Sequence, residues 1–445
     1  MTLFEQVRTA GVVGAGGAGF PTHVKLQGQA EYVLLNGAEC EPLLRVDQQL
    51  MARYPTEILT ALNAVRESVG AYRAIIGIKQ KHTQVIATLT QSLSDLHLDH
   101  AIEIAPLADI YPAGDEQVLV YELTGRVVPE MGLPLHVGCV VMNPETLLNV
   151  YHATHATPVT QTYVTLAGDI PNPQTIQAPV GTPIQDLLML SGVKDLSGYA
   201  VIDGGPMMGP VMADFDGHLT KAQKGFIILR KDNHLIKRKS ATPQQCYRIN
   251  RSTCEQCRLC TDLCPRFLLG HDINPHKTMR LINYGIDNNL LKAQTQLCCG
   301  CNLCELFSCP IELYPRGANS HFKAQLAQTG TRYQPQASEP VPRTNRTQQL
   351  LPSKRLVARL GLTAFDQPAP LTTLGIVPKQ VRIMTRQHVG APAVPTVAVG
   401  SNVSVGQCIG EIPTDSLGAA IHASIAGIVT AVTPDYIDIH ATKGD

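Results

Sequence analysis

Two cysteine runs constrain the fold of this chain more than any other feature of its sequence. The first run has the spacing C-x2-C-x2-C-x3-C-P, and its members are Cys254, Cys257, Cys260 and Cys264. The second run has one extra residue before its last cysteine, and its members are Cys298, Cys301, Cys304 and Cys309. Three cysteines at such short spacing can present their thiolates from one tight loop, and the proline after the fourth cysteine turns the chain away. We therefore expect this region to bind metal through its thiolates.

Paired runs of this kind indicate a ferredoxin-like helical domain with two 4Fe-4S clusters, in which the fourth cysteine of each run ligates the other cluster. One cluster is then expected on Cys254, Cys257, Cys260 and Cys309, and the other on Cys298, Cys301, Cys304 and Cys264. Zinc is the alternative for any C-x2-C pair, but eight cysteines in two sets of three plus one fit zinc poorly. The spacing therefore predicts a protein that transfers single electrons.

Five of the 13 cysteines lie outside these sets. Cys299 is adjacent to Cys298 and could replace it as a ligand, although its spacing to Cys301 is too short for the motif. The other four are scattered, and we expect them to be buried apolar thiols: Cys40, Cys139, Cys246 and Cys408. No disulfide framework is expected, because thiolate-ligated clusters belong in a reducing compartment.

Length and charge exclude several classes of protein. The chain has 445 residues, which favours three or four domains over one core. It carries 36 basic and 36 acidic residues, so there is no electrostatic case for nucleic-acid binding. We find no pattern of a signal peptide, and no apolar stretch approaches the ~18–20 residues of a membrane helix. We therefore expect a cytoplasmic protein without direct membrane insertion.

The apolar pattern divides the chain into five parts. Residues 1–155 alternate helical and strand-like segments, such as the strand 74–78 and a helical stretch from Lys79 onward, which predicts an α/β domain. Residues 156–235 have short strands broken by Gly and Pro, and residues 240–325 hold the cysteine runs. Residues 326–380 form a predicted linker with a proline-rich stretch at 333–342 and a basic docking helix at 353–360. Residues 381–445 are again β-rich.

This last part resembles a barrel-sandwich domain of the lipoyl and biotinyl type. Carrier versions of that fold attach their cofactor to a lysine at an exposed hairpin. The corresponding segment here, residues 423–426, reads Ala-Ser-Ile-Ala. We therefore expect an interaction or packing module rather than a cofactor carrier.

Residues 11–22 are unusually rich in glycine. Glycine allows backbone N–H groups to converge on a phosphate or to lie under a ring, because no Cβ blocks the approach. Gly14, Gly16 and Gly19 match G-x-G-x-x-G, but no clear strand precedes them and no acidic residue follows at the expected distance. The loop is therefore not an ordinary dinucleotide fingerprint.

Three further polar turns accompany this loop, at residues 36–42, 111–116 and 141–146. The first follows a predicted strand, 32–35, and so lies at a carboxyl end, where α/β folds bind ligands. Each turn alone is more typical of an ordinary surface turn. The four loops together predict a ligand site.

This set of loops resembles the flavin- and NADH-binding subunit of respiratory complex I and, more closely, the RnfC subunit of the Rnf ferredoxin–NAD oxidoreductases. Segments 166–170 and 203–209 resemble the SLBB (β-grasp) domain of that family, so the resemblance covers nearly the whole chain. It implies a multidomain protein with a Rossmann-like α/β domain that binds FMN and NADH, an SLBB β-grasp domain, the 4Fe-4S domain and a C-terminal barrel-sandwich hybrid domain. The implied cofactor contacts are Gly14, Gly16, Gly17, Gly19, Phe20, Lys25, Asn36, Glu39, Glu41, Gly114, Asp115, Glu116 and Asn143.

Within this set, the resemblance implies that Phe20 stacks on the nicotinamide or adenine, and that Glu41 and Glu116 meet the ribose of NADH. Two features depart from complex I: Ala38 stands in place of an acidic residue, and no second aromatic residue is found near Gln27 and Gly28. In RnfC the barrel-sandwich domain lies at the amino terminus. Its position here, with the stretched spacing before Cys309, resembles the cobalamin reductases of propanediol-utilisation microcompartments.

These resemblances imply a function. NADH delivers a hydride, clusters accept single electrons, and a flavin can do both. The implied acceptor is corrinoid cobalt, reduced to cob(I)alamin for an adenosyltransferase inside a bacterial microcompartment, with shell or enzyme proteins as further partners. Hydride transfer needs positioning rather than a side-chain acid or base, so we name no catalytic residue. Two alternatives remain open: an RnfC-like subunit that couples NAD(H) and ferredoxin in a membrane complex, and an electron-relay adaptor that does not bind NADH. No D-x-H-x-x-G run indicates a tight corrinoid site.

Overall fold

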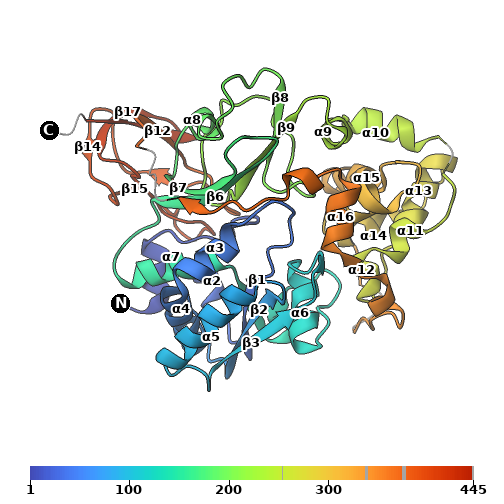
Figure 1. Ribbon diagram of the computed structural model, residues 1–445, viewed down its shortest axis with the longest axis horizontal. Helices are drawn as coiled ribbons and strands as arrows, with labels where there is room; N and C mark the ends of the chain where they lie inside the picture. The colour runs from blue at the N-terminus through green and yellow to red at the C-terminus, as the bar shows by residue number, and fades with distance from the viewer. Residues whose placement is uncertain (253, 336–338, 373–376, 443–445) are drawn as a thin grey trace.

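The computed structural model describes residues 1–252, 254–335, 339–372 and 377–442. Figure 1 shows an α/β domain from the first part of the chain, with a β-rich domain above it. A helical domain lies to one side of these two and a small β domain lies to the other. Among the described residues, we find no helix that combines the length and apolar character needed to cross a membrane.

The α/β domain has a four-stranded parallel sheet in the order β3-β2-β1-β5. Alternate residues of β1 enter different cores: Val33 and Leu35 pack with α3, α4, α5 and α7, whereas Leu34 packs with α6. Lys79 ends β2, and the next helix begins only at Thr83, so the predicted start of that helix was wrong by four residues. The elements are α1 (Leu3–Thr9), α2 (Thr22–Lys25), β1 (Tyr32–Gly37), α3 (Val46–Arg53), α4 (Pro55–Ser68), β2 (Arg73–Lys79), α5 (Thr83–Asp95), β3 (Ile102–Leu107), β4 (Ile110–Tyr111), α6 (Glu116–Thr124), η1 (Pro134–Val137), β5 (Cys139–Met142) and α7 (Pro144–Thr154).

The second domain has a mixed sheet in the order β11-β7-β6-β9-β8. Its two central strands, β6 and β9, run parallel, and each has an antiparallel neighbour, β7 and β8. Two hairpin-like pairs joined through a parallel centre, with one helix packed on the sheet, form a β-grasp. The elements are β6 (Gln161–Gly168), β7 (Gln174–Pro179), α8 (Ile184–Met189), β8 (Tyr199–Asp203) and β9 (Gly225–Arg230).

The helical domain is built from short helices, four of which begin with a proline: Pro243, Pro265, Pro275 and Pro315. Proline suits a first turn because its missing N–H has no partner there in any case. The elements are α9 (His234–Lys239), α10 (Pro243–Asn250), α11 (Leu259–Asp262), α12 (Pro265–Leu268), α13 (Pro275–Tyr284), α14 (Asn289–Gln294), η2 (Thr295–Leu297), η3 (Leu303–Ser308) and α15 (Pro315–Thr329).

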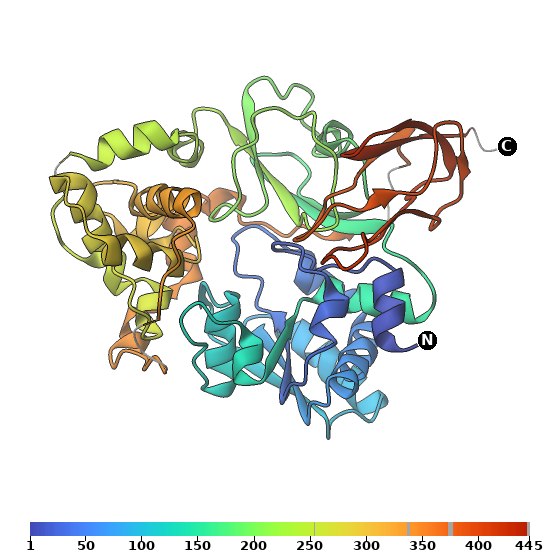
Figure 2. The same cartoon turned by 180° about the vertical axis from the view of Figure 1, so that it is seen from behind.

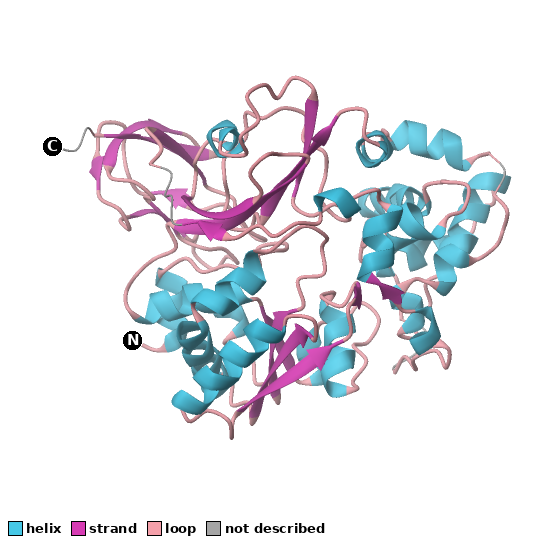
Figure 3. Cartoon of the chain, viewed as in Figure 1, coloured by secondary structure: helices cyan, strands magenta, loops and turns pink. Residues whose placement is uncertain are grey.

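The segment after α15 connects the other domains. Residues 336–338 of the predicted proline-rich stretch lie outside the described residues. Beyond them β10 (Leu351–Pro352) pairs with β4, and α16 (Ser353–Arg359) buries Leu356 and Val357 in a core shared with the β-grasp and helical domains. The segment then passes between the β-grasp sheet and the α/β domain, as Figure 3 shows, and adds β11 (Leu371–Thr372) to the β-grasp sheet. Two further 3-10 turns are η4 (Arg346–Gln349) and η5 (Thr363–Phe365).

The C-terminal domain consists of two small sheets, β12-β18-β17-β14 and β13-β15-β16. Its core is purely aliphatic and includes Val381, Ile383, Val429 and Ile437. Figure 2 shows this domain resting on the first segments of the chain and on the β-grasp sheet. The elements are β12 (Gln380–Met384), β13 (Val394–Pro395), β14 (Asn402–Val403), β15 (Cys408–Glu411), β16 (Ile421–His422), β17 (Gly427–Val432) and β18 (Tyr436–Ala441).

Candidate flavin and cluster sites

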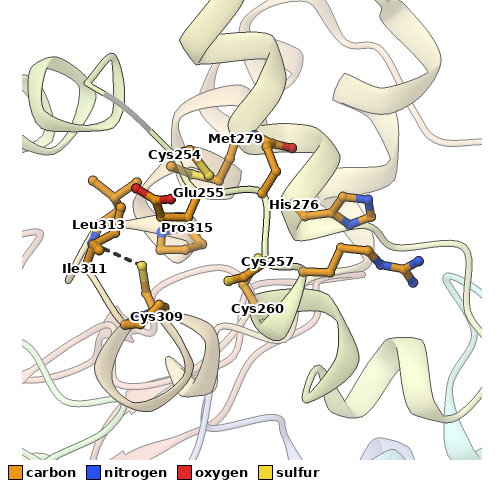
Figure 4. A pocket seen from close by; sticks show the side chains of 13 residues that line it. Cys254, Glu255, Cys257, Cys260, His276, Met279, Cys309, Ile311, Leu313 and Pro315 are labelled. Atoms are coloured by element: carbon orange, nitrogen blue, oxygen red, sulfur yellow. Dashed lines mark hydrogen bonds between the residues drawn. The ribbon is translucent and has the colours of Figure 1, made fainter.

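The first predicted set of cysteines surrounds a hollow of about 370 Å³ in the helical domain (Figure 4). Cys254, Cys257 and Cys260 come from the loop that leads into α11, and Cys309 comes from the second run. The Leu313 N–H donates to Cys309 Sγ at 3.3 Å. Among the described residues, no three Cys, His, Asp or Glu side chains converge on a single point that could hold one metal ion, so the four thiols line a hollow instead.

The two cysteine loops share one backbone conformation. The residue before the second cysteine of each run has a positive φ, +52° at Gln256 and +75° at Gly300. The residue after that cysteine does so too, +66° at Arg258 and +62° at Asn302. Left-handed turns are costly for residues other than glycine, and they persist where surrounding structure requires them. Here they turn three successive thiols toward one side of each loop.

The second predicted set is more deeply buried than the first. Burial, followed by the nearby Cys299 and Cys298, raises the pKa of the Cys264 thiol. Burial also raises the pKa of Cys304, with further contributions from Cys298, Glu305, Cys260 and Cys264. Several buried thiolates so close together repel one another, and bound metal would supply the compensating positive charge. The donors therefore suit a metal cluster, and the influence of Cys260 on Cys304 shows that the two sets are neighbours.

The remaining cysteines give mixed results. A hydrogen bond from the Cys301 thiol lowers the pKa of Cys299, which lies next to Arg266 and Asp115. Cys139 and Cys246 are buried, as predicted, and Cys40 is half-buried. The prediction for Cys408 was wrong: it is exposed, because it occupies an outward position of β15 and the following residue, Ile409, takes the inward one.

The glycine-rich loop closes on itself above the sheet of the α/β domain. The Gly14 N–H donates to the Phe20 carbonyl oxygen at 2.9 Å, next to a bridge between Val13 and Pro21. The Ala15 N–H donates to Thr146 Oγ1 at 3.0 Å, which ties the loop to the turn before α7. No atom of another segment lies within 4 Å of the Cβ position of Gly17, so this part of the loop is open to a ligand among the described residues.

The predicted polar turns meet at the same edge of the sheet. Lys25 Nζ donates to the Val141 carbonyl oxygen at 2.8 Å and lies 3.7 Å from Glu116 Oε1. Asn36 Nδ2 donates to the Gly114 carbonyl oxygen at 2.9 Å. Asn143 immediately precedes α7 at the end of β5, and its side chain makes no capping hydrogen bond to that helix. The four loops singled out in the sequence therefore form one cluster.

Two predicted cofactor contacts bind other domains instead. The Asp115 carboxylate caps α6 and also forms a two-pronged ion pair with Arg266, with distances of 2.9 and 3.0 Å. The Glu41 carboxylate accepts hydrogen bonds from the N–H groups of Met207 and Met208, both at 2.9 Å. Both carboxylates thus connect the flavin-type domain to its neighbours, Asp115 to the helical domain and Glu41 to the β-grasp domain.

Sequence reasoning missed a buried ion-pair cluster directly beneath the glycine loop. Lys224 Nζ lies 2.9 Å from Asp47 Oδ1 and 2.8 Å from Glu145 Oε2, and of these three residues only Glu145 belongs to a turn that the sequence marked. A Cβ on Gly16 would come within 2.9 Å of the Lys224 side chain. Burial and the Asp47 charge raise the pKa of the nearby Glu39 carboxyl to about 7, although Glu39 also accepts a hydrogen bond from the Asp47 N–H.

A direct contact joins the flavin-type domain to the second cysteine set. Tyr111, which is 2 % exposed, donates its hydroxyl to the Cys301 carbonyl oxygen at 2.7 Å. Together with the pair between Asp115 and Arg266, this contact fixes the turn 111–116 against the cysteine loop.

Three family models match parts of the chain. Residues 7–152 match the Nuo51 FMN-binding domain, residues 253–314 a 4Fe-4S dicluster domain, and residues 367–443 the RnfC barrel sandwich hybrid domain. These matches confirm the predicted fold class and the predicted cofactors, FMN and two 4Fe-4S clusters. The open glycine loop and the two sets of thiols are suitable to hold them.

Full-length relatives are also found. The cobalamin reductase PduS of Salmonella typhimurium is 41 % identical over 439 residues, which cover 98 % of this chain and 95 % of that protein. A component of the Na⁺-translocating ferredoxin:NAD⁺ oxidoreductase complex of Acetobacterium woodii is 34 % identical over 64 % of this chain and 63 % of its own. A crystal structure of an NAD⁺-reducing NiFe hydrogenase aligns with 82 % of this chain and 67 % of its own, at 22 % identity and a TM-score of 0.47. On the full-length match, this chain belongs to the PduS family.

Proposed function

We propose that this protein is an NADH-dependent cobalamin reductase with the overall reaction NADH + 2 cob(II)alamin → NAD⁺ + H⁺ + 2 cob(I)alamin. The observation that carries the proposal is the near full-length similarity to two PduS cobalamin reductases, at 41 and 40 % identity. FMN supplies the conversion between a two-electron donor and one-electron acceptors. The reduced cobalt would be consumed by an adenosyltransferase, and PduS names a role in propanediol utilisation, which suggests a bacterial microcompartment as the location.

The α/β domain would hold the flavin and the dinucleotide. We assign the flavin phosphate and ring to the open glycine loop and the facing side chains Lys25, Asn36 and Glu39, because these groups meet at one sheet edge. Phe20 and the half-exposed Glu116 stand at the accessible side of this cluster and would face NADH. Glu41 would act by fixing the β-grasp domain, since its carboxylate is occupied by two backbone N–H groups.

The contacts between domains suggest an order for the clusters. The second cysteine set lies next to the flavin-type domain through the hydroxyl of Tyr111 and the guanidinium of Arg266. The first set adjoins the second, because Cys260 influences Cys304, and its Cys257 is exposed. Electrons would therefore enter the helical domain at the second set.

The proposal is tested anaerobically with the purified holoprotein, by visible spectroscopy. NADH should bleach the flavin and cluster absorbance, and added cob(II)alamin should restore it while cob(I)alamin forms. A Cys257→Ala variant should keep flavin reduction and lose most cobalt reduction. If the flavin bleaches but only ferredoxin-like acceptors restore it, an RnfC-like role replaces this one. If NADH does not bleach the flavin, the protein is a relay that takes electrons from another donor.

A further inference from the structure

A large hollow separates the β-grasp domain from the helical domain. It encloses about 1380 Å³ of space including its open mouth, and it contains none of the predicted flavin contacts. Its walls come from the β-grasp turn at Met208, from α9 and α10, from the second cysteine loop, and from α15. Figure 1 shows α9 and α10 bridging the two domains over this region.

The hollow reaches the second cysteine loop directly. Asn302 and Glu305 both line it, and they flank Cys304 in the chain. A molecule seated there would lie beside the loop that we assign to a cluster. The hollow is therefore placed to receive an electron acceptor.

Its polar lining includes groups that are buried and unpaired. Asn302 is 5 % exposed and donates its Nδ2 to the Met207 carbonyl oxygen, whereas its Oδ1 accepts no hydrogen bond from any described residue. Arg316 Nε is likewise buried without a partner in the described part of the chain. A buried polar atom without a hydrogen bond costs free energy, and a ligand that pairs with it recovers that cost. The lining thus offers one free acceptor and one free donor.

The charge of the lining is mainly positive. Three cationic side chains, Arg238, Lys239 and Arg316, accompany a single carboxylate, Glu305, which already accepts a hydrogen bond from the Gly317 N–H at 2.9 Å. Arg238 is held in place by the Leu313 carbonyl oxygen at 3.1 Å and by the Tyr314 ring at 4.2 Å. A ligand with an anionic group is favoured here.

We propose that this hollow seats the corrinoid acceptor, an inference that rests on the proposed function. A corrinoid is a broad macrocycle rimmed by carboxamides, each of which both donates and accepts hydrogen bonds, and its nucleotide loop carries one phosphodiester. The free acceptor of Asn302 and the free donor of Arg316 match the carboxamides, and the cationic side chains match the phosphodiester. In the step itself one electron leaves the adjacent cluster, cobalt goes from +2 to +1, and neither a proton nor a group is transferred.

Two alanines on α15 provide a matched pair of variants. Ala324 lines the hollow and is exposed, whereas Ala327 is exposed on the same helix and does not line it. Ala324→Phe should raise the KM for cob(II)alamin by about tenfold or more, because the added ring occupies space that the macrocycle needs. The ratio of cobalamin reduction to ferricyanide reduction should fall with it. Ala327→Phe should change neither quantity.

A second pair tests the polar contacts. Arg316→Gln should weaken binding of hydroxocobalamin to the oxidised holoprotein, measured by equilibrium dialysis, by about fivefold to tenfold. The control is Arg248→Gln, since Arg248 is exposed on α10 and does not line the hollow.

The outcomes separate this inference from the proposed function. If the wild-type protein reduces cobalamin and both α15 variants do so with an unchanged KM, the hollow is not the seat and only this inference falls. If Ala324→Phe raises the KM for NADH instead, the hollow binds the dinucleotide and the inference is overturned. If the wild-type protein binds cobalamin in a way that depends on Arg316 but does not reduce it, the proposed function falls and the site stands. If it neither binds nor reduces cobalamin, both fall.

Discussion

Lys224 should contribute more to stability than any exposed charge on this protein, and replacing it with methionine tests that expectation. Its ammonium comes from the β-grasp domain and joins two carboxylates of the α/β domain, Asp47 and Glu145. Burial lowers the pKa of Lys224, but the two carboxylates together raise it further, so the net pKa is above its usual value and the cation persists at neutral pH. Lys224→Met keeps the length of the side chain and removes only this charge.

The size of the effect follows from the burial of the partners. The Glu145 side chain is 1 % exposed and that of Asp47 is 11 % exposed, so neither carboxylate can be solvated once the ammonium is gone. Removing one partner from a buried ion pair costs about 3–5 kcal/mol. For a cooperative unit of about 150–250 residues, each kcal/mol lowers Tm by roughly 2–4 °C, which gives a fall of roughly 6–20 °C.

The assay is differential scanning calorimetry of the holoprotein at pH 7, with Arg73→Met as the control. Arg73 and Glu103 also form a pair at 2.9 Å, but their side chains are 47 and 51 % exposed, so losing that pair should cost only about 0–1 kcal/mol. The deficit of Lys224→Met should shrink as pH falls from 7 to 5, because its unpaired buried carboxylates become protonated and neutral. A Lys224→Met protein that melts within about 2 °C of the wild type at pH 7 would refute the reasoning.

Three further perturbations follow from the same structure. Cys254→Ser and Cys309→Ser should remove the same cluster and leave about half of the iron, whereas loss of different clusters in the two variants, seen by electron paramagnetic resonance, would contradict the exchanged fourth ligand. Arg266→Gln leaves the Asp115 carboxylate without its cation, so stopped-flow absorbance should show slower electron transfer from flavin to clusters, and an unchanged rate would show that the contact does not guide the electron. Burial and the Asp47 charge raise the folded pKa of Glu39 to about 7 from an ordinary 4.5, so protonated Glu39 stabilises the fold below about pH 4.5 and this contribution is lost as pH rises to about 7; Tm of the wild type relative to Glu39→Gln should fall across that window, and parallel curves would exclude the raised pKa.

The local features of this protein could be predicted from its sequence because each is encoded within a few residues. The spacing of Cys254, Cys257 and Cys260 requires a tight loop, and the two cysteine loops indeed share positive φ values on both sides of their second cysteine. The polar turn after Tyr32–Gly37 could be placed at a sheet edge because the carboxyl ends of parallel strands meet there. Cys408 was misplaced because an apolar identity does not determine which face of a short strand a residue occupies.

The features that sequence reasoning missed all lie between domains. Lys224 pairs with a carboxylate 177 positions away, Glu41 with a backbone N–H 166 positions away, and Tyr111 with a carbonyl oxygen 190 positions away. Nothing within a local window distinguishes such a Lys or Glu from one on a solvated surface, since only the partner makes its burial tolerable. The same separation explains the two acidic residues assigned by resemblance to cofactors: Glu41 and Asp115 have the right identity at the right place in their motifs, yet each is held by a neighbouring domain. In this fold the carboxylates near the flavin therefore have a second task, which is to set the distance from the flavin-type domain to the clusters, and a substitution at either one should alter electron transfer even where it leaves the bound flavin in place.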